Sequence, residues 1–260
     1  MKHYALIGDP VSHSLSPIIY NTLFAHYGID AHFDVLCIPK GALDTVPAMG
    51  LSGFACTMPH KHDILPLLSR ITPEAERMGS VNIVRADDDG LYGCSTDGAG
   101  LLRAIINAGG NICGANITII GTGGAARAAV FSLLPHTKHI TLAGRNAMAL
   151  KSLCNEAGLC RGYEDIFSTD LSHCDILINA TPQGMQGQAP FPCLSFINEL
   201  PRTALVCDMV YAPHDTLLLQ AACWRELGVM NGIAMLIEQA CLAFEFWTGI
   251  APDHKLLSKL

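Results

Sequence analysis

The stretch NITIIGTGGAA, residues 116–126, decides the fold of this chain. Apolar and β-branched residues lead into a glycine-rich turn, and an alanine-rich segment follows. This order predicts a buried strand, a tight turn and a helix, the unit that holds the pyrophosphate in Rossmann-type domains. Gly121 would permit the turn, Gly123 would let the backbone approach the phosphates, and Ala126 would pack the helix on the strand.

The first residues of the predicted helix, Gly124 and Ala125, complete this expected cofactor-binding turn. Backbone N–H groups at a helix start are free of intrahelical partners, and the helix dipole favours negative charge there. These groups would therefore face the phosphates. A glycine-rich turn that merely connects a strand to a helix is the alternative.

Outward from this turn, apolar segments alternate with helical patterns. Strands are expected at 139–144, 175–181 and 204–210, with helices at 148–158 and 213–228. Buried strands separated by helices predict a parallel, doubly wound sheet.

The N-terminal part of the chain predicts a second α/β lobe. We expect strands at 3–8, 31–36, 53–57, 80–85 and 90–93, and helices at 16–28, 41–49, 59–68 and 97–108. Ser16 is expected at the N-cap of the first helix, and the helix at 59–68 is expected to break near Pro66. A long amphipathic helix at 232–249 would end at Gly249 and return to the first lobe.

Composition excludes several classes of protein. The 260 residues carry 16 basic and 23 acidic side chains, a formal charge of −7, and half of the residues are hydrophobic. We therefore expect a globular protein with no nucleic-acid partner. No apolar run of about 20 residues is present and the N-terminus lacks a secretory pattern, which predicts a cytoplasmic protein with no membrane partner.

Cysteine and histidine spacing predicts neither a disulfide framework nor a metal site. The eleven cysteines form no CxxC pair, so we interpret them as reduced, mostly buried small hydrophobes. The eleven histidines are dispersed, and His60 and His62, which flank Lys61, have no partner at ligand spacing.

Arg145 predicts the type of dinucleotide. It lies about 20 residues beyond the glycines, where an acid would accept from the 2′-hydroxyl of NAD, and no carboxylate lies beside it in the sequence. A guanidinium there favours the 2′-phosphate of NADP, with NAD as the alternative cofactor and a solvated loop charge as the alternative interpretation.

Polar residues in the first lobe predict a substrate site. Ser14 and Ser16 could hold a carboxylate, while Lys61 and Asp97 stand at strand ends and could transfer a proton during hydride transfer. From the residues alone, a surface lysine and a helix-capping aspartate are the ordinary alternative.

The motifs taken together are similar to those of the shikimate dehydrogenase family. They follow in order over almost the whole chain: GDPVSHSLSP, GFACTMPHK, GSVNIV, STDGAG, GTGGAA, NAT, DMVYAPHDT and MLIEQACLAFEFWTG. The resemblance implies a substrate lobe and a Rossmann lobe. It also implies reduction of 3-dehydroshikimate with NADPH, a step of aromatic amino acid biosynthesis, or oxidation of quinate or shikimate with NAD.

The resemblance also implies site residues by position. Lys61 and Asp97 would be the catalytic pair. The residues expected around the substrate are Ser14, Ser16, Thr57, Asn82, Tyr211 and Gln239. Those expected around the cofactor are Gly121, Gly123, Gly124, Ala125, Arg145, Thr181, Gly232 and Met235.

The domain limits expected on this basis are 1–97 for substrate binding and catalysis, 98–232 for the NADP-binding Rossmann domain, and 233–260 for C-terminal helices on the first domain. The partner would be a small cyclic hydroxy acid, and the protein would be a monomer or homodimer. The alternatives are a quinate or aminoshikimate dehydrogenase, or a non-catalytic dinucleotide-binding paralogue.

Several positions differ from the usual family motifs. Tyr20 replaces a histidine, Ala55 and Ser95 each replace an asparagine, and Gly144 precedes Arg145 where the family has Asn-Arg-Thr. Such differences are expected of a divergent paralogue.

Overall fold

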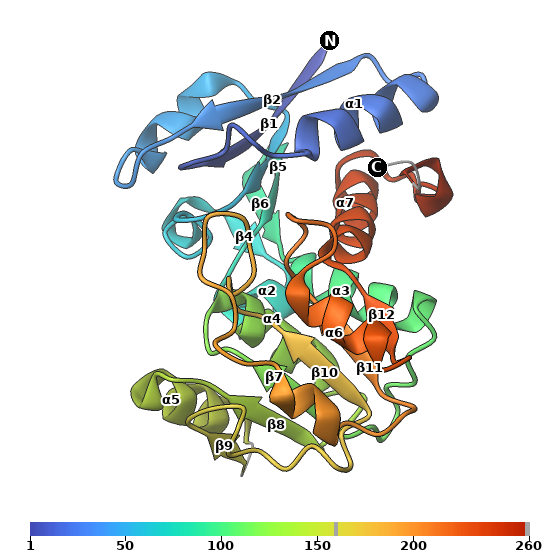
Figure 1. The fold of residues 1–260 in the computed structure, drawn as a ribbon. Helices are drawn as coiled ribbons and strands as arrows, with labels where there is room; N and C mark the ends of the chain where they lie inside the picture. Colours follow the sequence, from blue (N-terminus) through green and yellow to red (C-terminus); the bar gives the residue numbers. More distant parts are fainter. Residues whose placement is uncertain (159–160, 258–260) are drawn as a thin grey trace. The chain divides into compact units, whose positions relative to one another are not determined.

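The computed structural model describes residues 1–158 and 161–257 and divides the chain into two compact units (Figure 1). Unit 1 comprises Met1–Thr96 and Gln239–Leu260, and unit 2 comprises Asp97–Glu238. Each is built on a six-stranded sheet. The last long helix, α7 (Gly232–Thr248), begins in unit 2 and ends in unit 1.

The sheet of unit 2 is parallel throughout, which confirms the doubly wound prediction. Its strands run in the order β12-β11-β10-β7-β8-β9. Their bounds are β7 Ile117–Ile120, β8 Ile140–Ala143, β9 Gly162–Tyr163, β10 Ile176–Asn179, β11 Leu205–Asp208 and β12 Gly228–Met230. The helices are α3 Asp97–Asn107, α4 Gly124–Leu133, α5 Ala147–Ala157 and α6 Leu217–Trp224, with a short 3-10 helix, η3, at Ser195–Glu199.

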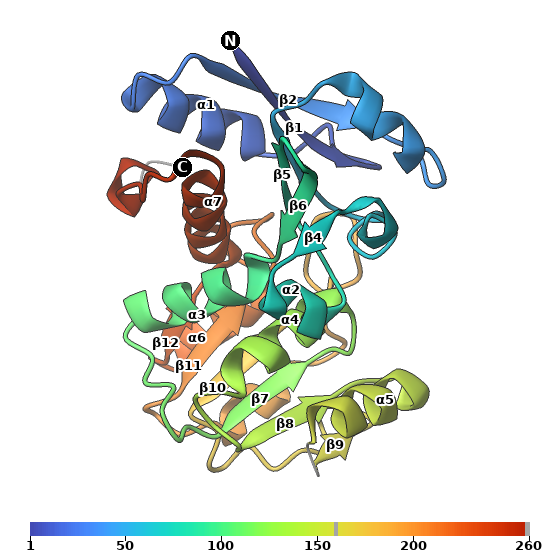
Figure 2. The ribbon, with the colours of Figure 1, turned by 180° about the vertical axis from the view of Figure 1, so that it is seen from behind.

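Helices cover both faces of this sheet. Side chains alternate along each strand, so each strand presents apolar side chains to both faces, and helices bury them. On β10, Ile176 and Ile178 belong to the core that contains α3, α4 and α5, whereas Leu177 belongs to the core with η3 and α6. Figure 2 shows α3 and α4 in front of the sheet, and Figure 1 shows α6 on the opposite side. The near-continuous apolar runs of these strands follow from burial on both faces.

Unit 1 has a mixed sheet in the order β2-β1-β3-β5-β6-β4. Its strands are β1 Lys2–Gly8, β2 Ala31–Cys37, β3 Gly53–Cys56, β4 Arg70–Ile71, β5 Ile83–Asp87 and β6 Gly90–Cys94. Its α-helices are α1 Ser16–His26 and α2 Pro73–Met78, and its 3-10 helices are η1 Leu43–Met49, η2 Leu65–Leu67 and η4 His254–Leu257. β5 is antiparallel to β3 and β6, as the turn signal between β5 and β6 predicts.

Two side chains attach helices to one face of this sheet. The Asn21 amide on α1 donates to the Phe33 carbonyl and accepts from the Phe33 N–H, at 3.0 and 2.9 Å. On α7, the Trp247 indole donates to the Val84 carbonyl at 2.8 Å. A Cβ at Gly53 would lie 2.8 Å from that indole nitrogen, so only glycine leaves room for the ring.

Several expectations about local structure are wrong. The helix predicted at 59–68 is instead a set of turns followed by the 3-10 helix at Leu65–Leu67. The Lys61 carbonyl accepts from the Val81 N–H at 2.9 Å, so it does not accept from an N–H further along a helix. Residues 41–49 contain a 3-10 helix, and the helix expected at 213–228 is shorter. Five short elements, β4, α2, β9, β12 and the 3-10 helix η3, are absent from the sequence expectations because their patterns are too short to show a period.

The burial predicted for the cysteines is only partly correct. Among the described residues, Cys56, Cys94, Cys174, Cys207 and Cys241 are buried. Another four, Cys37, Cys113, Cys193 and Cys223, are exposed. The exposed thiols lie in loops or at the ends of helices and strands, where an apolar sequence neighbourhood does not ensure burial.

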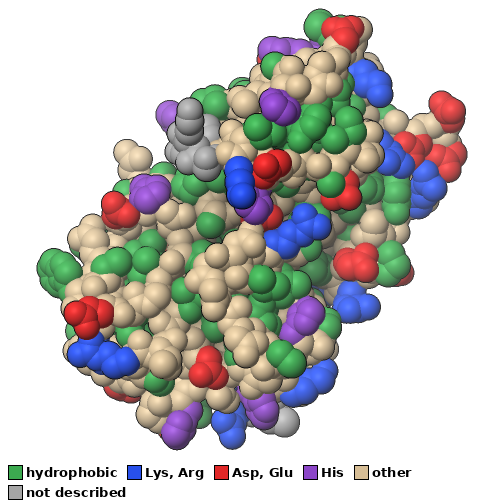
Figure 3. All heavy atoms as spheres, turned by 90° about the vertical axis from the view of Figure 1, so that its right-hand side faces the viewer, with side chains coloured by type: hydrophobic (Ala, Val, Ile, Leu, Met, Phe, Trp, Pro, Cys, Tyr) green, Lys and Arg blue, Asp and Glu red, His purple; other side chains and the backbone are tan. Residues whose placement is uncertain are grey.

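Charged side chains of both signs lie side by side on the face drawn in Figure 3. This mixture differs from the continuous basic surface that tracks a phosphate backbone. Among the helices of residues 1–158 and 161–257, none is both long enough and apolar enough to cross a membrane.

Candidate functional site

The glycine turn of unit 2 has the geometry that the sequence predicts. Gly121 follows β7 with φ +124°, a conformation that favours glycine. A Cβ there would lie 3.0 Å from the Ala180 carbonyl oxygen. At Gly123, by contrast, a Cβ would have no atom within 4 Å, so there is open space above the turn for a ligand.

Helix α4 begins directly after this turn, at Gly124. Gly124 and Ala125 are exposed, while Ala126 is fully buried against the sheet, as predicted. The Arg127 N–H donates to the Gly123 carbonyl, so the N–H groups of the preceding residues in the first turn are available to an anion. The residues present therefore fit a pyrophosphate group.

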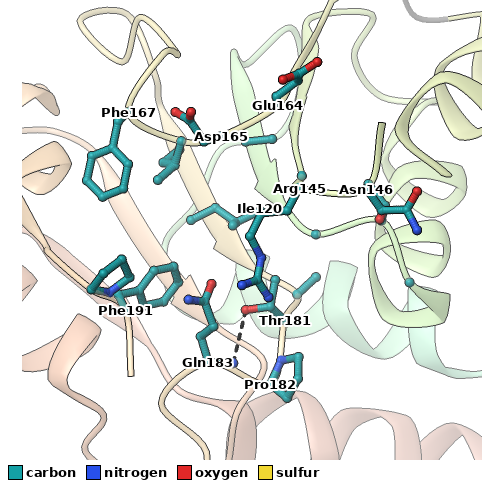
Figure 4. Close-up of a pocket in the computed structure, with 18 residues that line it drawn as sticks. Ile120, Arg145, Asn146, Glu164, Asp165, Phe167, Thr181, Pro182, Gln183 and Phe191 are labelled. Carbon is teal, nitrogen blue, oxygen red and sulfur yellow. Dashed lines mark hydrogen bonds between the residues drawn. The ribbon is translucent and has the colours of Figure 1, made fainter. Parts of the chain in front are cut away.

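A pocket of about 350 Å³ opens beside the turn (Figure 4). Gly121, Gly123, Arg145 and Thr181 line it together, although they come from the ends of β7, β8 and β10. In Figure 4 the Arg145 guanidinium points toward Thr181 and Gln183. The carboxyl ends of neighbouring parallel strands thus bring a cation next to the phosphate-binding turn, as in dinucleotide-binding sheets.

The other end of the pocket contains residues that the sequence interpretation missed. Phe167 and Phe191 line it, and each ring packs edge-on against Phe196 with centroids 5.7 Å apart. Glu164 and Asp165 line the same pocket, so acids lie near Arg145 in space although none is beside it in sequence. No periodic signal could have found these residues, because they lie in irregular segments after β9 and β10.

A buried hydrogen-bond network supports the Thr181 side of the pocket. Asn179 accepts from the Thr181 hydroxyl at 2.7 Å and donates to Asp208 at 2.9 Å. Asp208 also accepts from the Val210 N–H and the Thr216 hydroxyl, at 3.0 and 2.6 Å. Burial raises the pKa of Asp208, whereas these hydrogen bonds act in the opposite direction. The network fixes the backbone that leads into the pocket.

Replacing Thr216 by Val should destabilise the protein by roughly 2–4 kcal/mol. The Thr216 hydroxyl caps α6 by accepting from the Leu219 N–H and also donates to Asp208, so both bonds are lost. Thr216→Ser keeps the hydroxyl and should stay within about 1 kcal/mol of wild type. Urea unfolding of both variants measures the difference, and a Thr216→Val variant as stable as wild type would show that the two hydroxyl bonds contribute little.

Gly232 and Met235 lie in the first turn of α7, outside this pocket. A Cβ on Gly232 would lie 2.6 Å from the Met209 carbonyl oxygen, so the backbones of the two segments approach as only glycine allows. Met235 is half-buried against the core beneath α3 and α4. Their expected proximity to a nicotinamide stays a prediction.

In unit 1, β3 leads into the segment that carries Thr57 and Lys61. The Thr57 N–H donates to the Ile7 carbonyl at 2.9 Å, which continues the β1–β3 pairing. Thr57 and Lys61 are both partly exposed. Ala55 is only 6% exposed and lies on the same strand face as Thr57, since side chains alternate along a strand.

Asn82 and Gln239 form one polar cluster with Thr96, although they are far apart in sequence. The Asn82 amide donates to the Thr96 hydroxyl at 3.0 Å and to Gln239 Oε1 at 3.3 Å. The Thr96 N–H donates back to Asn82 Oδ1 at 2.8 Å. The structure thus joins two of the predicted substrate residues, and Thr96 is a member that the sequence interpretation missed.

Ser14 and Ser16 also lie together. The Ser14 hydroxyl donates to Ser16 Oγ at 3.0 Å and accepts from the Ser16 N–H at 3.1 Å. The N-cap assignment of Ser16 is wrong: α1 begins at Ser16, its N-cap is Leu15, and Ser16 is buried. These two hydrogen bonds hold the Ser14 and Ser16 hydroxyls together at the start of α1.

The remaining predicted residues belong to unit 2. Asp97 is the first residue of α3 and is partly exposed, and Tyr211 is exposed after β11. Unit 1 therefore supplies hydroxyl, amide and ammonium groups suited to a polar ring compound, and unit 2 supplies a phosphate-binding turn with a cation. Among the residues that the structure describes, no three His, Cys, Asp or Glu side chains are grouped as a metal site requires.

Comparisons with known proteins agree with this chemistry. The model of the shikimate dehydrogenase substrate binding domain matches residues 6–84, and that of the shikimate 5′-dehydrogenase C-terminal domain matches residues 232–256. The chain is 37% identical over 270 residues to a shikimate dehydrogenase (NADP(+)) of Geobacillus kaustophilus, covering 100% of this chain and 97% of the relative.

Two solved structures extend the similarity to the fold. Shikimate 5-dehydrogenase of Thermus thermophilus, in complex with NADP(H) and shikimate, has a TM-score of 0.90 and 30% identity, covering 100% of this chain and 98% of that one. The ligand-free 5-ketofructose reductase of a Gluconobacter strain has a TM-score of 0.89 and 26% identity, covering 99% and 96%.

Proposed function

Because this chain belongs to the shikimate dehydrogenase family, we propose that it is an NADP-dependent oxidoreductase that interconverts 3-dehydroshikimate and shikimate. The similarity extends over the full length of relatives that carry this activity in their names. The observation that carries the proposal is the pocket in which the glycine turn and Arg145 lie together. That pocket offers both a pyrophosphate site and a cation for a 2′-phosphate.

The nicotinamide, when bound, supplies the hydride that reduces the carbonyl carbon. Lys61 donates the proton that the carbonyl oxygen requires and stabilises the negative charge that develops on it. Asp97, the second member of the expected catalytic pair, would accept a hydrogen bond from a ring hydroxyl of the substrate. In the reverse direction, Lys61 takes the proton from the alcohol.

The polar groups of unit 1 hold the substrate. Ser14 and Ser16 donate to the carboxylate, and Thr57, Asn82 and Gln239 pair with the ring hydroxyls. Amide groups suit hydroxyls because each amide can both donate and accept. Tyr211 contributes a further hydroxyl from unit 2.

On the cofactor side, Arg145 would hold the 2′-phosphate, and Thr181 would contact the cofactor from the same pocket. Phe167 and Phe191 give the far end of the pocket an apolar lining suited to a flat adenine ring. Gly232 and Met235 would approach the nicotinamide. Glu164 and Asp165 reduce the positive potential around Arg145, so NAD remains an alternative cofactor.

A second candidate, oxidation of quinate, an aminoshikimate or another cyclic polyol, is favoured by one observation. Ala55 stands where shikimate-active members carry asparagine, and alanine offers no hydrogen bond to a ring hydroxyl. One assay distinguishes the candidates: initial rates of the purified protein with shikimate and quinate, each with NADP and NAD. A higher kcat/KM for shikimate with NADP supports the first proposal, and a higher value for quinate supports the second.

Introducing asparagine at Ala55 should raise kcat/KM for shikimate by roughly 10-fold, because a hydroxyl buried against alanine loses about 1–3 kcal/mol of hydrogen bonding. Ala55 lies on the same strand face as Thr57 and is only 6% exposed, so the added amide would extend toward the substrate residues. Steady-state kinetics with shikimate measure the gain. High wild-type activity that the substitution leaves unchanged or lowers would mean that Ala55 only packs in the strand.

We propose that unit 1 binds the substrate and unit 2 binds the cofactor. These units are close to the expected limits of 1–97 with 233–260 and of 98–232, except that Asp97 and residues 233–238 lie in unit 2. The protein acts in the cytoplasm as a monomer or homodimer on a small cyclic hydroxy acid. Sedimentation at several concentrations tests the oligomeric state.

A further inference from the structure

We propose that His60 is a positioning residue that anchors the backbone segment carrying Lys61, so that the ammonium group is held in one place for proton transfer. The catalytic part of this inference rests on the proposed function of Lys61. The anchoring part rests on contacts within unit 1 alone. The two parts are therefore tested separately below.

The segment around Lys61 is held by individual contacts rather than by a regular element. Residues 57–64 form no strand or helix, only turns. The His60 side chain is nevertheless 0% exposed, although Met58 and His62 on either side of it are exposed. His60 and Ile64, which is also fully buried, are thus the two side chains that attach this segment to the core of unit 1.

The attachment is a hydrogen bond across the sheet. His60 Nε2 lies 2.6 Å from the carbonyl oxygen of Ile38, which follows β2. Ile38 is itself fixed, because its N–H donates to the Gly8 carbonyl at the end of β1, at 3.0 Å. The ring therefore connects the Lys61 segment to a rigid part of the sheet.

This contact determines which nitrogen of the His60 ring carries the hydrogen. A carbonyl oxygen can only accept, so Nε2 carries the hydrogen and, in the neutral ring, Nδ1 does not. Nδ1 is buried and, in the part of the chain that the structure describes, has no hydrogen-bond partner. A buried acceptor without a partner is costly, and an apolar side chain would fill the space without that cost. The Nε2 hydrogen bond is therefore the feature that distinguishes histidine here from a leucine.

Two further bonds fix the residues next to His60. The Lys61 carbonyl accepts from the Val81 N–H at 2.9 Å, and the exposed His62 ring donates through Nδ1 to the Gly79 carbonyl. His60 is thus bonded to the residue after β2, while Lys61 and His62 are both bonded to residues 79–81. With both neighbours held, the Lys61 side chain has fewer orientations to sample, which favours proton transfer in the reacting geometry.

The test compares His60→Leu, which keeps an apolar filling but removes the donor, with His60→Gln, whose amide N–H reaches a similar distance from the backbone. We expect His60→Leu to lower kcat about 10-fold while KM for shikimate and for NADP stays within about 2-fold, because a small misplacement affects the transition state more than binding. His60→Gln should recover most of the lost kcat. His32→Leu, at an exposed histidine of unit 1, is the matched control and should leave kcat unchanged.

Amide hydrogen exchange of the intact protein tests the anchor independently of activity. In His60→Leu the peptide covering residues 57–64 and the Val81 N–H should exchange at least several-fold faster, with the rest of unit 1 unchanged. Unchanged exchange there, or a kcat that Gln does not restore, would overturn the inference. If exchange rises in His60→Leu but Lys61→Ala keeps normal activity, the anchor stands and the proposed role of Lys61 is wrong.

Discussion

Replacing Lys61 by Ala is expected to lower kcat by about 10²-fold or more, because a positioned general acid or base contributes about that much to the rate. The affinity for NADP should stay within a few-fold, since Lys61 belongs to unit 1 and the cofactor pocket to unit 2. A loss confined to kcat identifies an interaction made in the transition state rather than in substrate binding.

The measurement is a steady-state analysis with shikimate and NADP, together with a direct titration of NADP binding. Lys40→Ala is the matched control, because Lys40 is an exposed lysine of the same unit. Near-normal kcat in Lys61→Ala would remove the proposed proton-transfer role. A rise in KM with kcat unchanged would make Lys61 a substrate-binding residue only.

Replacing Arg145 by Ala should weaken NADP binding by roughly 1.5–3 kcal/mol, or about 10- to 150-fold, which is the contribution of a charge-assisted hydrogen bond. The guanidinium lines the cofactor pocket and points toward Thr181 and Gln183 (Figure 4). NAD lacks the 2′-phosphate, so its affinity should change much less.

Binding of NADP and NAD to wild type and Arg145→Ala, measured by calorimetry at one ionic strength, gives the two losses directly. Arg103→Ala, at an exposed arginine of α3 in the same unit, controls for a general change in net charge. Equal weakening of both cofactors, or no weakening, would show that Arg145 is only a solvated loop charge.

The local sequence by itself determined the strand–turn–helix unit at 116–133 and the alternation of strands and helices after it. Glycine chemistry and side-chain periodicity act over a few residues, so Gly121 and Ala126 have the environments that their positions predict. The family motifs added the set of candidate site residues. The same local rules failed at 59–68, where the Lys61 carbonyl bonds to Val81 instead of continuing a helix.

Only the tertiary structure decided which distant segments meet. Phe167 follows β9 and Phe191 follows β10, and both line the cofactor pocket. In the sheet, β10 lies on one side of β7, and β8 and β9 lie on the other. The segments that follow these parallel strands therefore meet at the same edge of the sheet. Asn82 meets Gln239, and His60 meets Ile38, through the same kind of long-range contact. The sequence carries no local period for such pairs, because their energy comes from packing and hydrogen bonds formed after the sheets assemble.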